Sequence, residues 1–217
     1  MKQLTLLAIA LLIISSESIA QYNSKIGFEF RFGAGSNINF GNVKSVPISE
    51  YEIISFKPGN TRNYNLGFLF RTAKNTYFKI AVGERNLRWH YSQDYNQNGI
   101  SDDLTHLSEF NYFHLTPSVI RIFKNKNLSI PIEVGLNIND TELASENTSG
   151  IIYPRRFTFD LRLGAGVSVQ ANNNLSFSLN GVLTQGLFNY SNNNLLEGKI
   201  IPLQWGLEFG TAFKLFD

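Results

Sequence analysis

The stretch FTFDLRLGAGVSVQ (Phe157–Gln170) alternates apolar and polar side chains over its whole length. Odd-numbered positions from Phe157 to Val169 are apolar, whereas even-numbered positions are small, polar or charged and include Asp160 and Arg162. A period of two predicts a β-strand with one apolar and one polar face. Charges near the middle of a long strand are unusual in a soluble sandwich. The pattern therefore favours a transmembrane barrel with lipid outside and polar side chains inside.

The same alternation recurs along the chain, for example in IGFEFRF (Ile26–Phe32) and YNLGFLFR (Tyr64–Arg71). Short polar connections at 73–76, 124–127 and 171–174 alternate with longer ones at 36–61, 92–109, 139–155 and 189–199. The sequence predicts an all-β fold, an eight-stranded antiparallel transmembrane β-barrel with short periplasmic turns and four longer outer loops. The predicted strands are 25–35, 62–72, 77–91, 110–123, 128–138, 156–170, 175–188 and 200–216.

Some residues depart from the strand pattern. Pro117, Pro131 and Pro202 fall inside predicted strands and lack a backbone donor, so we expect bulges or strand ends there. In 77–91 the apolar positions change parity between Val82 and Leu87. Either a bulge intervenes or the strand has already left the membrane.

The N-terminal stretch MKQLTLLAIALLIISSESIA (1–20) reads as a cleaved signal peptide, with 21–217 as one barrel domain. Lys2 is the positive region, Leu4–Ile14 is an apolar run too short to span a bilayer comfortably, and Ala20 precedes the cleavage site. The chain has no cysteine, so an exported protein of this size must be held together otherwise, as by a closed sheet. A net charge of +2 without a basic patch argues against a nucleic-acid partner.

Two segments carry recognisable hairpin motifs. FHLTPSVIRIFKNKNLSIPIEVGLNIN (Phe113–Asn139) has an L-x-x-P step and a Lys/Asn turn. FDLRLGAGVSVQANNNLSFSLNGVLTQGLFNY (Phe159–Tyr190) has a GAG motif. The two segments resemble the central hairpin and a later hairpin of the small Bacteroidetes outer-membrane β-barrel proteins of the PorT-like group. The resemblance implies an outer-membrane location and no enzymatic activity. A few members are tied to type IX secretion, which implies an unidentified secretion partner.

The alternation predicts that a set of charged side chains points into the barrel. The interior of an eight-stranded barrel is just wide enough for side chains to fill it. Buried charges are tolerated only when paired. Because the first and last strands meet at closure, Glu29 and Arg31 should approach Glu208. Arg162 should lie at the level of Glu133. We expect an ion-pair plug, with a narrow polar path or proton relay as the alternative. The predicted inward charges are Glu29, Arg31, Arg71, Lys79, Glu133, Asp160, Arg162 and Glu208.

The stretch DYNQNGISDD (Asp94–Asp103) places oxygen-bearing side chains at alternate positions before a glycine, as calcium-binding loops do. Position 12 of an EF-hand loop would be Thr105, which cannot supply a bidentate carboxylate, so Asp102 or Asp103 would have to close the site. The alternative is a plain solvated loop, because Asx-Gly turns favour the same composition. The candidate calcium ligands are Asp94, Asn96, Asn98, Ile100 through its carbonyl, and Asp102.

No catalytic constellation stands out in the sequence. The histidines His90, His106 and His114 show neither Ser–His–Asp spacing nor a paired metal-ligand spacing. No cofactor other than calcium is predicted. The sequence therefore favours a non-enzymatic structural or surface-interaction protein. Two alternatives are a soluble secreted lipocalin-like barrel that binds an apolar ligand, and a membrane-embedded lipid-modifying enzyme.

Aromatic residues gather near the predicted strand ends, as interface girdles do. The C-terminal segment FGTAFKLFD resembles the signal read by the barrel-insertion machinery, apart from Asp217 after Phe216. The expected partners are therefore outer-membrane lipid and the barrel-insertion machinery. The expected girdle residues are Trp89, Tyr91, Tyr112, Tyr153 and Tyr190 toward the outer loops, and Phe123, Phe213 and Phe216 toward the periplasm.

Overall fold

The computed structural model describes residues 26–40, 43–45, 51–97, 100–125, 128–141, 155–172, 174–190 and 196–216. The expected signal peptide at 1–20 lies outside them. Among the described residues, no helix is long and apolar enough to cross a bilayer. The strands are β1 (Ile26–Asn39), β2 (Val43–Ser45), β3 (Tyr51–Lys57), β4 (Gly59–Ala73), β5 (Thr76–Gln97), β6 (Ile100–Asn125), β7 (Leu128–Asp140), β8 (Phe157–Gln170), β9 (Leu175–Gly186), β10 (Leu196–Gly198) and β11 (Pro202–Phe216).

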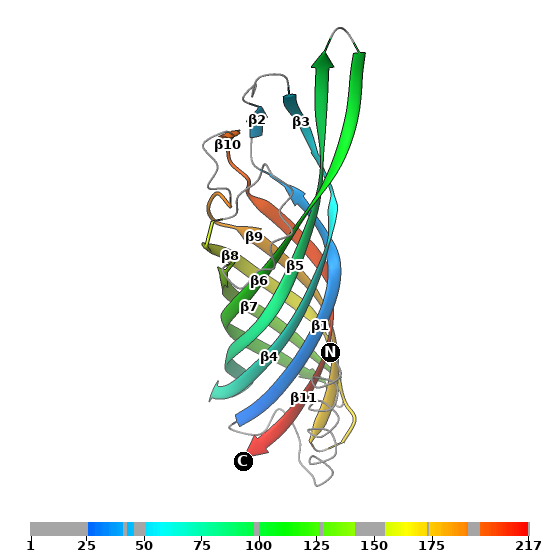
Figure 1. Ribbon diagram of the computed structural model, residues 1–217. Coiled ribbons are helices and arrows are strands. Elements are labelled where there is room, and N and C mark those ends of the chain that lie inside the picture. The colour runs from blue at the N-terminus through cyan, green and yellow to red at the C-terminus, as the bar shows by residue number, and fades with distance from the viewer. Residues whose placement is uncertain are drawn as a thin grey trace, which may run out of the picture.

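Eight of these strands form one closed antiparallel barrel (Figure 1). Its order is β5, β4, β1, β11, β9, β8, β7 and β6, and β6 pairs back onto β5. β1 and β11 pair along their whole length, from Ile26 opposite Phe216 to Asn39 opposite Pro202. Closure gives the backbone N–H and C=O groups of the wall partners on both sides, as a lipid environment requires. The predicted eight-stranded barrel is confirmed.

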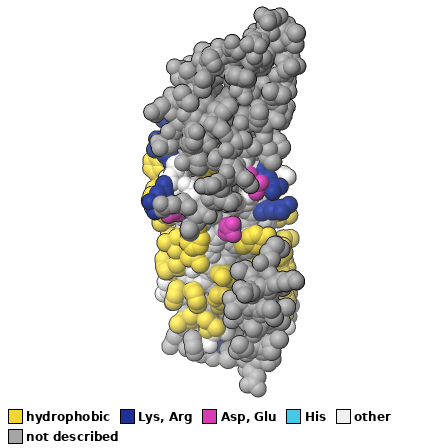
Figure 2. All heavy atoms as spheres, in the orientation of Figure 1, with side chains coloured by type: hydrophobic (Ala, Val, Ile, Leu, Met, Phe, Trp, Pro, Cys, Tyr) yellow, Lys and Arg dark blue, Asp and Glu magenta, His cyan; other side chains and the backbone are white. Residues whose placement is uncertain are grey.

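The apolar faces of the strands point outward and the polar faces point inward. On β8, Leu163 is 40% exposed, whereas its neighbour Arg162 is 4% exposed. Figure 2 shows outward apolar side chains gathered in a band on the face in view, and exposed apolar residues occur on all eight barrel strands, as a belt requires. A lipocalin-like barrel would need these faces inside, so that alternative is wrong.

The belt has a height that suits a membrane. On β4 the outward apolar residues from Tyr64 to Phe70 lie between the exposed Arg62 and Arg71. On β8 the apolar positions run from residue 157 to residue 169, which is roughly 30 Å at about 3.3 Å per residue and a tilt of about 40°. A hydrocarbon core is about as thick. Charged side chains gather at the loop-side edge of the belt (Figure 2). The exposed ones are Arg62, Glu84, Arg155, Arg156 and Lys199.

Strands β5 and β6 form a hairpin that rises beyond the other strands (Figure 1). Their register is continuous from Thr76 opposite Arg121 to Gln97 opposite Ile100. The predicted loop at 92–109 is therefore too long, because β5 continues to Gln97 and β6 begins at Ile100. β3 pairs alongside β5 in this region, within the stretch 36–61 that was expected to be a single loop. From Leu87 to Gln97 the hairpin extends roughly 30 Å along the strand.

The change of apolar parity in β5 is not caused by a bulge. β5 keeps one register with β4 from Tyr77 to Leu87, and Leu87 is completely buried inside the barrel. The strand has instead passed the end of the lipid belt by Leu87, whose side chain points inward.

The prolines also leave the strand register unchanged. Between β6 and β7 the pairing is interrupted at Pro117 and resumes at Ser118 in the same register. Between β7 and β8 it is interrupted at Pro131 and resumes at Ile132. The bulges expected at Pro117 and Pro131 are therefore wrong, whereas Pro202 begins β11 as a strand end.

Candidate functional site

A network of charged side chains fills the turn-side half of the barrel interior. Arg31 lies 2.7 Å from Glu29 and 2.5 Å from Glu133, and Lys79 Nζ lies 2.6 Å from Glu133 Oε1. Arg162 Nη2 lies 2.5 Å from Glu208 Oε2. All are buried. This first charge cluster has three cations and three carboxylates: Glu29, Arg31, Lys79, Glu133, Arg162 and Glu208.

Small residues on the wall make room for these long side chains. Gly33 of β1 is paired with Glu208 of β11. A Cβ added at Gly33 would lie 2.7 Å from Glu208 Cγ and 2.9 Å from the carbonyl oxygen of Leu207. The GAG segment that begins at Gly33 thus serves interior packing.

A second charge cluster lies nearer the outer loops and is built around Arg85 and Asp160. Arg85 Nη2 lies 2.7 Å from Asp160 Oδ2 and 3.0 Å from Asn139 Oδ1. The hydroxyl of Tyr190 donates to Asp160 Oδ1. Tyr112 packs edge-on against Tyr190 and lies under the Arg85 guanidinium, 5.6 Å from ring centre to Cζ. The salt bridge therefore sits in a pocket walled by aromatic rings.

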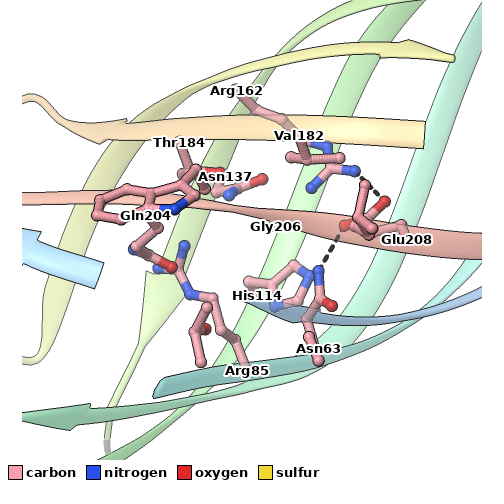
Figure 3. Close-up of a pocket in the computed structure, with 14 residues that line it drawn as sticks. Asn63, Arg85, His114, Asn137, Arg162, Val182, Thr184, Gln204, Gly206 and Glu208 are labelled. Atoms are coloured by element: carbon pink, nitrogen blue, oxygen red, sulfur yellow. Dashed lines mark hydrogen bonds and ion pairs between the residues drawn. The ribbon is translucent and has the colours of Figure 1, made fainter. Parts of the chain in front are cut away.

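A small cavity separates the two clusters (Figure 3). Its volume is about 30 Å³, and its lining includes Arg85, His114, Arg162, Gln204 and Glu208. His114 Nε2 contacts the side-chain oxygen of Asn65. A space of more than roughly 10–15 Å³ admits a water molecule, so the barrel is not packed solid at this level.

Apolar side chains close the interior beyond each cluster. The turn-side set shares inward positions on β4, β5, β6 and β11 and consists of Leu69, Tyr77, Ile120, Ile122 and Ala212. On the loop side Leu87, Phe110 and Ile200 are buried to 3% exposure or less, next to Tyr112 and Tyr190 of the second cluster. The polar interior thus lies between two apolar layers.

The predicted interior charges divide between these clusters. Glu29, Arg31, Glu133, Arg162 and Glu208 meet in the first cluster, with Arg31 3.6 Å from Glu208 and Arg162 3.5 Å from Glu133. Asp160 belongs to the second cluster.

Three residues lie elsewhere than expected. Arg71 is exposed at the turn-side end, so its inward placement is wrong. Tyr112 and Tyr190 are 1% exposed inside the barrel, so their assignment to a lipid-facing girdle is wrong. Phe123, by contrast, is 52% exposed on the outside.

Sequence reasoning missed Arg85 as the partner of Asp160. The signal was available: inward positions recur at every second residue from Lys79 to Leu87, and Arg85 has that parity. The apparent change of apolar face hid it.

The candidate calcium ligands lie in the β5–β6 hairpin. Asp94 and Asn96 are in β5, Ile100 and Asp102 are in β6, and Asn98 lies outside the described residues. The register sets Asp94 opposite Asp103 and Tyr95 opposite Asp102. The backbone there is a paired ladder, and calcium binding stays a prediction.

No family model and no curated protein sequence matches the chain. Several solved structures, however, match the fold of the chain. The outer membrane protein OprG of Pseudomonas aeruginosa matches with a TM-score of 0.51 and 12% identity over 91% of this chain and all of its own. The outer membrane protein AlkL in lipid bilayers has a TM-score of 0.49 and 15% identity, covering 94% of each chain. Neisserial surface protein A has a TM-score of 0.48 and 11% identity, covering 87% and 97%.

At such identities the likeness to OprG concerns the fold alone. It agrees with the closed antiparallel wall, the inward charges and the apolar belt of membrane height. A barrel whose outer face is apolar all round must be surrounded by lipid, because water would not solvate it. The chain is therefore an eight-stranded β-barrel of the outer-membrane type, placed in an outer membrane with lipid around its belt.

Proposed function

We propose that this barrel is a non-enzymatic outer-membrane protein that presents a contact surface through its β5–β6 hairpin. The observation that carries the proposal is the extension of that hairpin beyond the barrel wall. β4 pairs with β5 only as far as Leu87, and in the described part of the chain β7 pairs with β6 only from Phe113 onward. Beyond that level β3 flanks β5 and the strands leave the lipid belt.

The packed interior supports a role other than solute passage. Both charge clusters are paired across the lumen; a buried apolar set lies on the turn side of the first, and the buried Leu87, Phe110 and Ile200 lie on the loop side. We therefore expect no conductance of the porin kind when the purified chain is reconstituted into planar bilayers.

We also propose what kind of partner binds the β5–β6 hairpin. The resemblance to PorT-like Bacteroidetes barrels favours an accessory role in secretion, with an unidentified secretion or surface partner at the hairpin. The barrel-insertion machinery would be a transient partner during assembly. The buried His114, held against Asn65, favours a structural rather than a catalytic role.

The test is site-specific photo-crosslinking in intact cells. A photoreactive residue at Ser101, in the hairpin, should give a cross-linked product, whereas one at Ala171, beside the β8–β9 turn, should not give the same product. A shortened chain with Asn-Gly in place of residues 90–107 should still assemble, because Trp89 and Ser108 are already paired and can close the turn. Failure to form a product from several hairpin positions would contradict the proposal.

A further inference from the structure

The cavity between the two charge clusters is lined by more donors than acceptors. Its charged lining consists of the guanidinium groups of Arg85 and Arg162 and the carboxylate of Glu208. His114 and Gln204 also line it. Figure 3 shows these side chains arranged around one common space inside the wall.

Three N–H-bearing atoms at this cavity have no partner among the described residues. They are Arg85 Nε, Arg85 Nη1 and Gln204 Nε2. Within the second charge cluster only Nη2 of Arg85 donates hydrogen bonds, to Asp160, Asn139 and Tyr190. Both residues are 4% exposed, so bulk solvent does not satisfy these donors. Buried donors without partners are rare and call for a bound group.

The carboxylate and amide acceptors of the lining are engaged, apart from one ring nitrogen. Glu208 Oε2 is held by Arg162 at 2.5 Å, and Glu208 Oε1 accepts from Asn63 Nδ2 at 2.5 Å. The side-chain oxygen of Asn137 accepts from the hydroxyl of Thr116 at 2.8 Å. His114 Nδ1 has no partner among the described residues, so the unpaired capacity that faces the cavity lies mostly on the donor side.

We propose that this cavity is a binding site for one small monovalent anion of halide size. An anion accepts from several N–H groups at once, whereas a water molecule that accepts two must also place its own two hydrogens, and His114 Nδ1 is the one unpaired acceptor among the described lining atoms named above. The volume of about 30 Å³ holds a halide but not a sulfate, a phosphate or an organic carboxylate. The anion bridges Arg85 of the second charge cluster to Gln204 on the closing strand β11.

The experiment uses the full chain refolded in detergent, with bromide as the probe. Crystals grown in sodium bromide should show an anomalous peak beside Arg85 and Gln204. The urea unfolding midpoint should rise with bromide and saturate when sodium gluconate is exchanged for sodium bromide at constant ionic strength. Gln204→Glu places a carboxylate beside Arg85, and should remove both the peak and the saturable rise.

The matched control is Gln170→Glu, which makes the same charge change at an exposed position at the end of β8. It should keep the bromide response of the unaltered chain. The proposal is overturned if the cavity of the unaltered chain holds only water, or if its unfolding midpoint is the same in bromide and gluconate. A full bromide response in Gln204→Glu overturns it as well. The measurements on the unaltered chain decide the matter even if Gln204→Glu does not fold.

Discussion

Arg31 of β1 forms an ion pair with Glu133 of β7 across the full width of the barrel, with 2.5 Å between Nη1 and Oε2. The two strands lie opposite one another, because three strands separate them on either side of the closed sheet. Lys79 from β5 reaches the same carboxylate at 2.6 Å. Glu133 is thus a central brace that joins strands on different sides of the wall.

Replacing Glu133 by Gln should destabilise the barrel strongly. The change leaves Arg31 and Lys79 buried with one fewer carboxylate, and breaking a buried ion pair from one side costs about 3–5 kcal/mol. Urea unfolding in lipid vesicles measures the loss. Glu109→Gln is the control, because Glu109 pairs with the half-exposed Arg88 and should lose at most about 1 kcal/mol. Equal losses in the two variants would refute the bracing role.

Removing both partners of the second charge cluster should cost less than removing one. Arg85→Met leaves Asp160 buried without its cation, and Asp160→Leu leaves Arg85 buried without its carboxylate. Buried pairs replaced together by apolar residues lose much less stability than either single change. A double-mutant cycle by urea unfolding checks this. Additive losses would show that the two residues act independently.

An arginine in the middle of the lipid belt should be costly, whereas one at its edge should not. Leu163→Arg places a charge among outward side chains at mid-height and should lower the free energy of unfolding by about 2–4 kcal/mol. Phe157→Arg, at the loop-side end of the same face, should lower it by about 0–1 kcal/mol. Unfolding in vesicles compares them, and the reverse order would mean that the belt lies elsewhere.

Gly166→Ala should destabilise the wall, whereas Gly181→Ala should be tolerated. A Cβ at Gly166 would clash with the carbonyl oxygen of Leu179, but the nearest atom to a Cβ at Gly181 is 3.7 Å away. Overpacking of this kind costs about 1–3 kcal/mol. The folded fraction after refolding, read from the mobility difference between unheated and boiled samples in SDS, distinguishes them. Indistinguishable folded fractions would contradict the close approach of β8 and β9.

Calcium should protect the tip of the β5–β6 hairpin from proteolysis. Asp94 and Asp103 are opposed in the register, and a bound cation would offset their repulsion. Limited proteolysis with and without EDTA measures the protection, and Asp94→Ala should abolish it. If EDTA does not change the cleavage, the acidic tip binds no calcium and is a plain solvated turn.

Periodicity was enough to predict the barrel, because a period of two assigns each strand residue to lipid or lumen without reference to its neighbours. Parity placed Glu29, Arg31 and Glu208 correctly on the inner face. It could not predict that Arg31 pairs across the lumen with Glu133. That contact depends on side-chain length and strand stagger, which alternation does not encode.

The errors at Tyr112, Tyr190 and the β5–β6 hairpin share a physical origin at the outer end of the barrel. Tyr112 packs inside against Tyr190 and beneath Arg85, and Leu87 is completely buried. In the sequence, an inward apolar residue above the membrane looks the same as an outward one within it. The hairpin was misjudged for a related reason, because polar strands outside the lipid belt have the composition of loops.

The pairing of β1 with β11 has a consequence for biogenesis. β11 completes one side of β1 and follows the other barrel strands in the chain. Before the barrel closes, the apolar side chains of the belt are therefore not yet assembled into one surface. Without β11, β1 is paired on one side only, with β4, and Arg31 lacks the carboxylate of Glu208. We therefore expect the barrel to close only when both ends of the sheet are present at the membrane together.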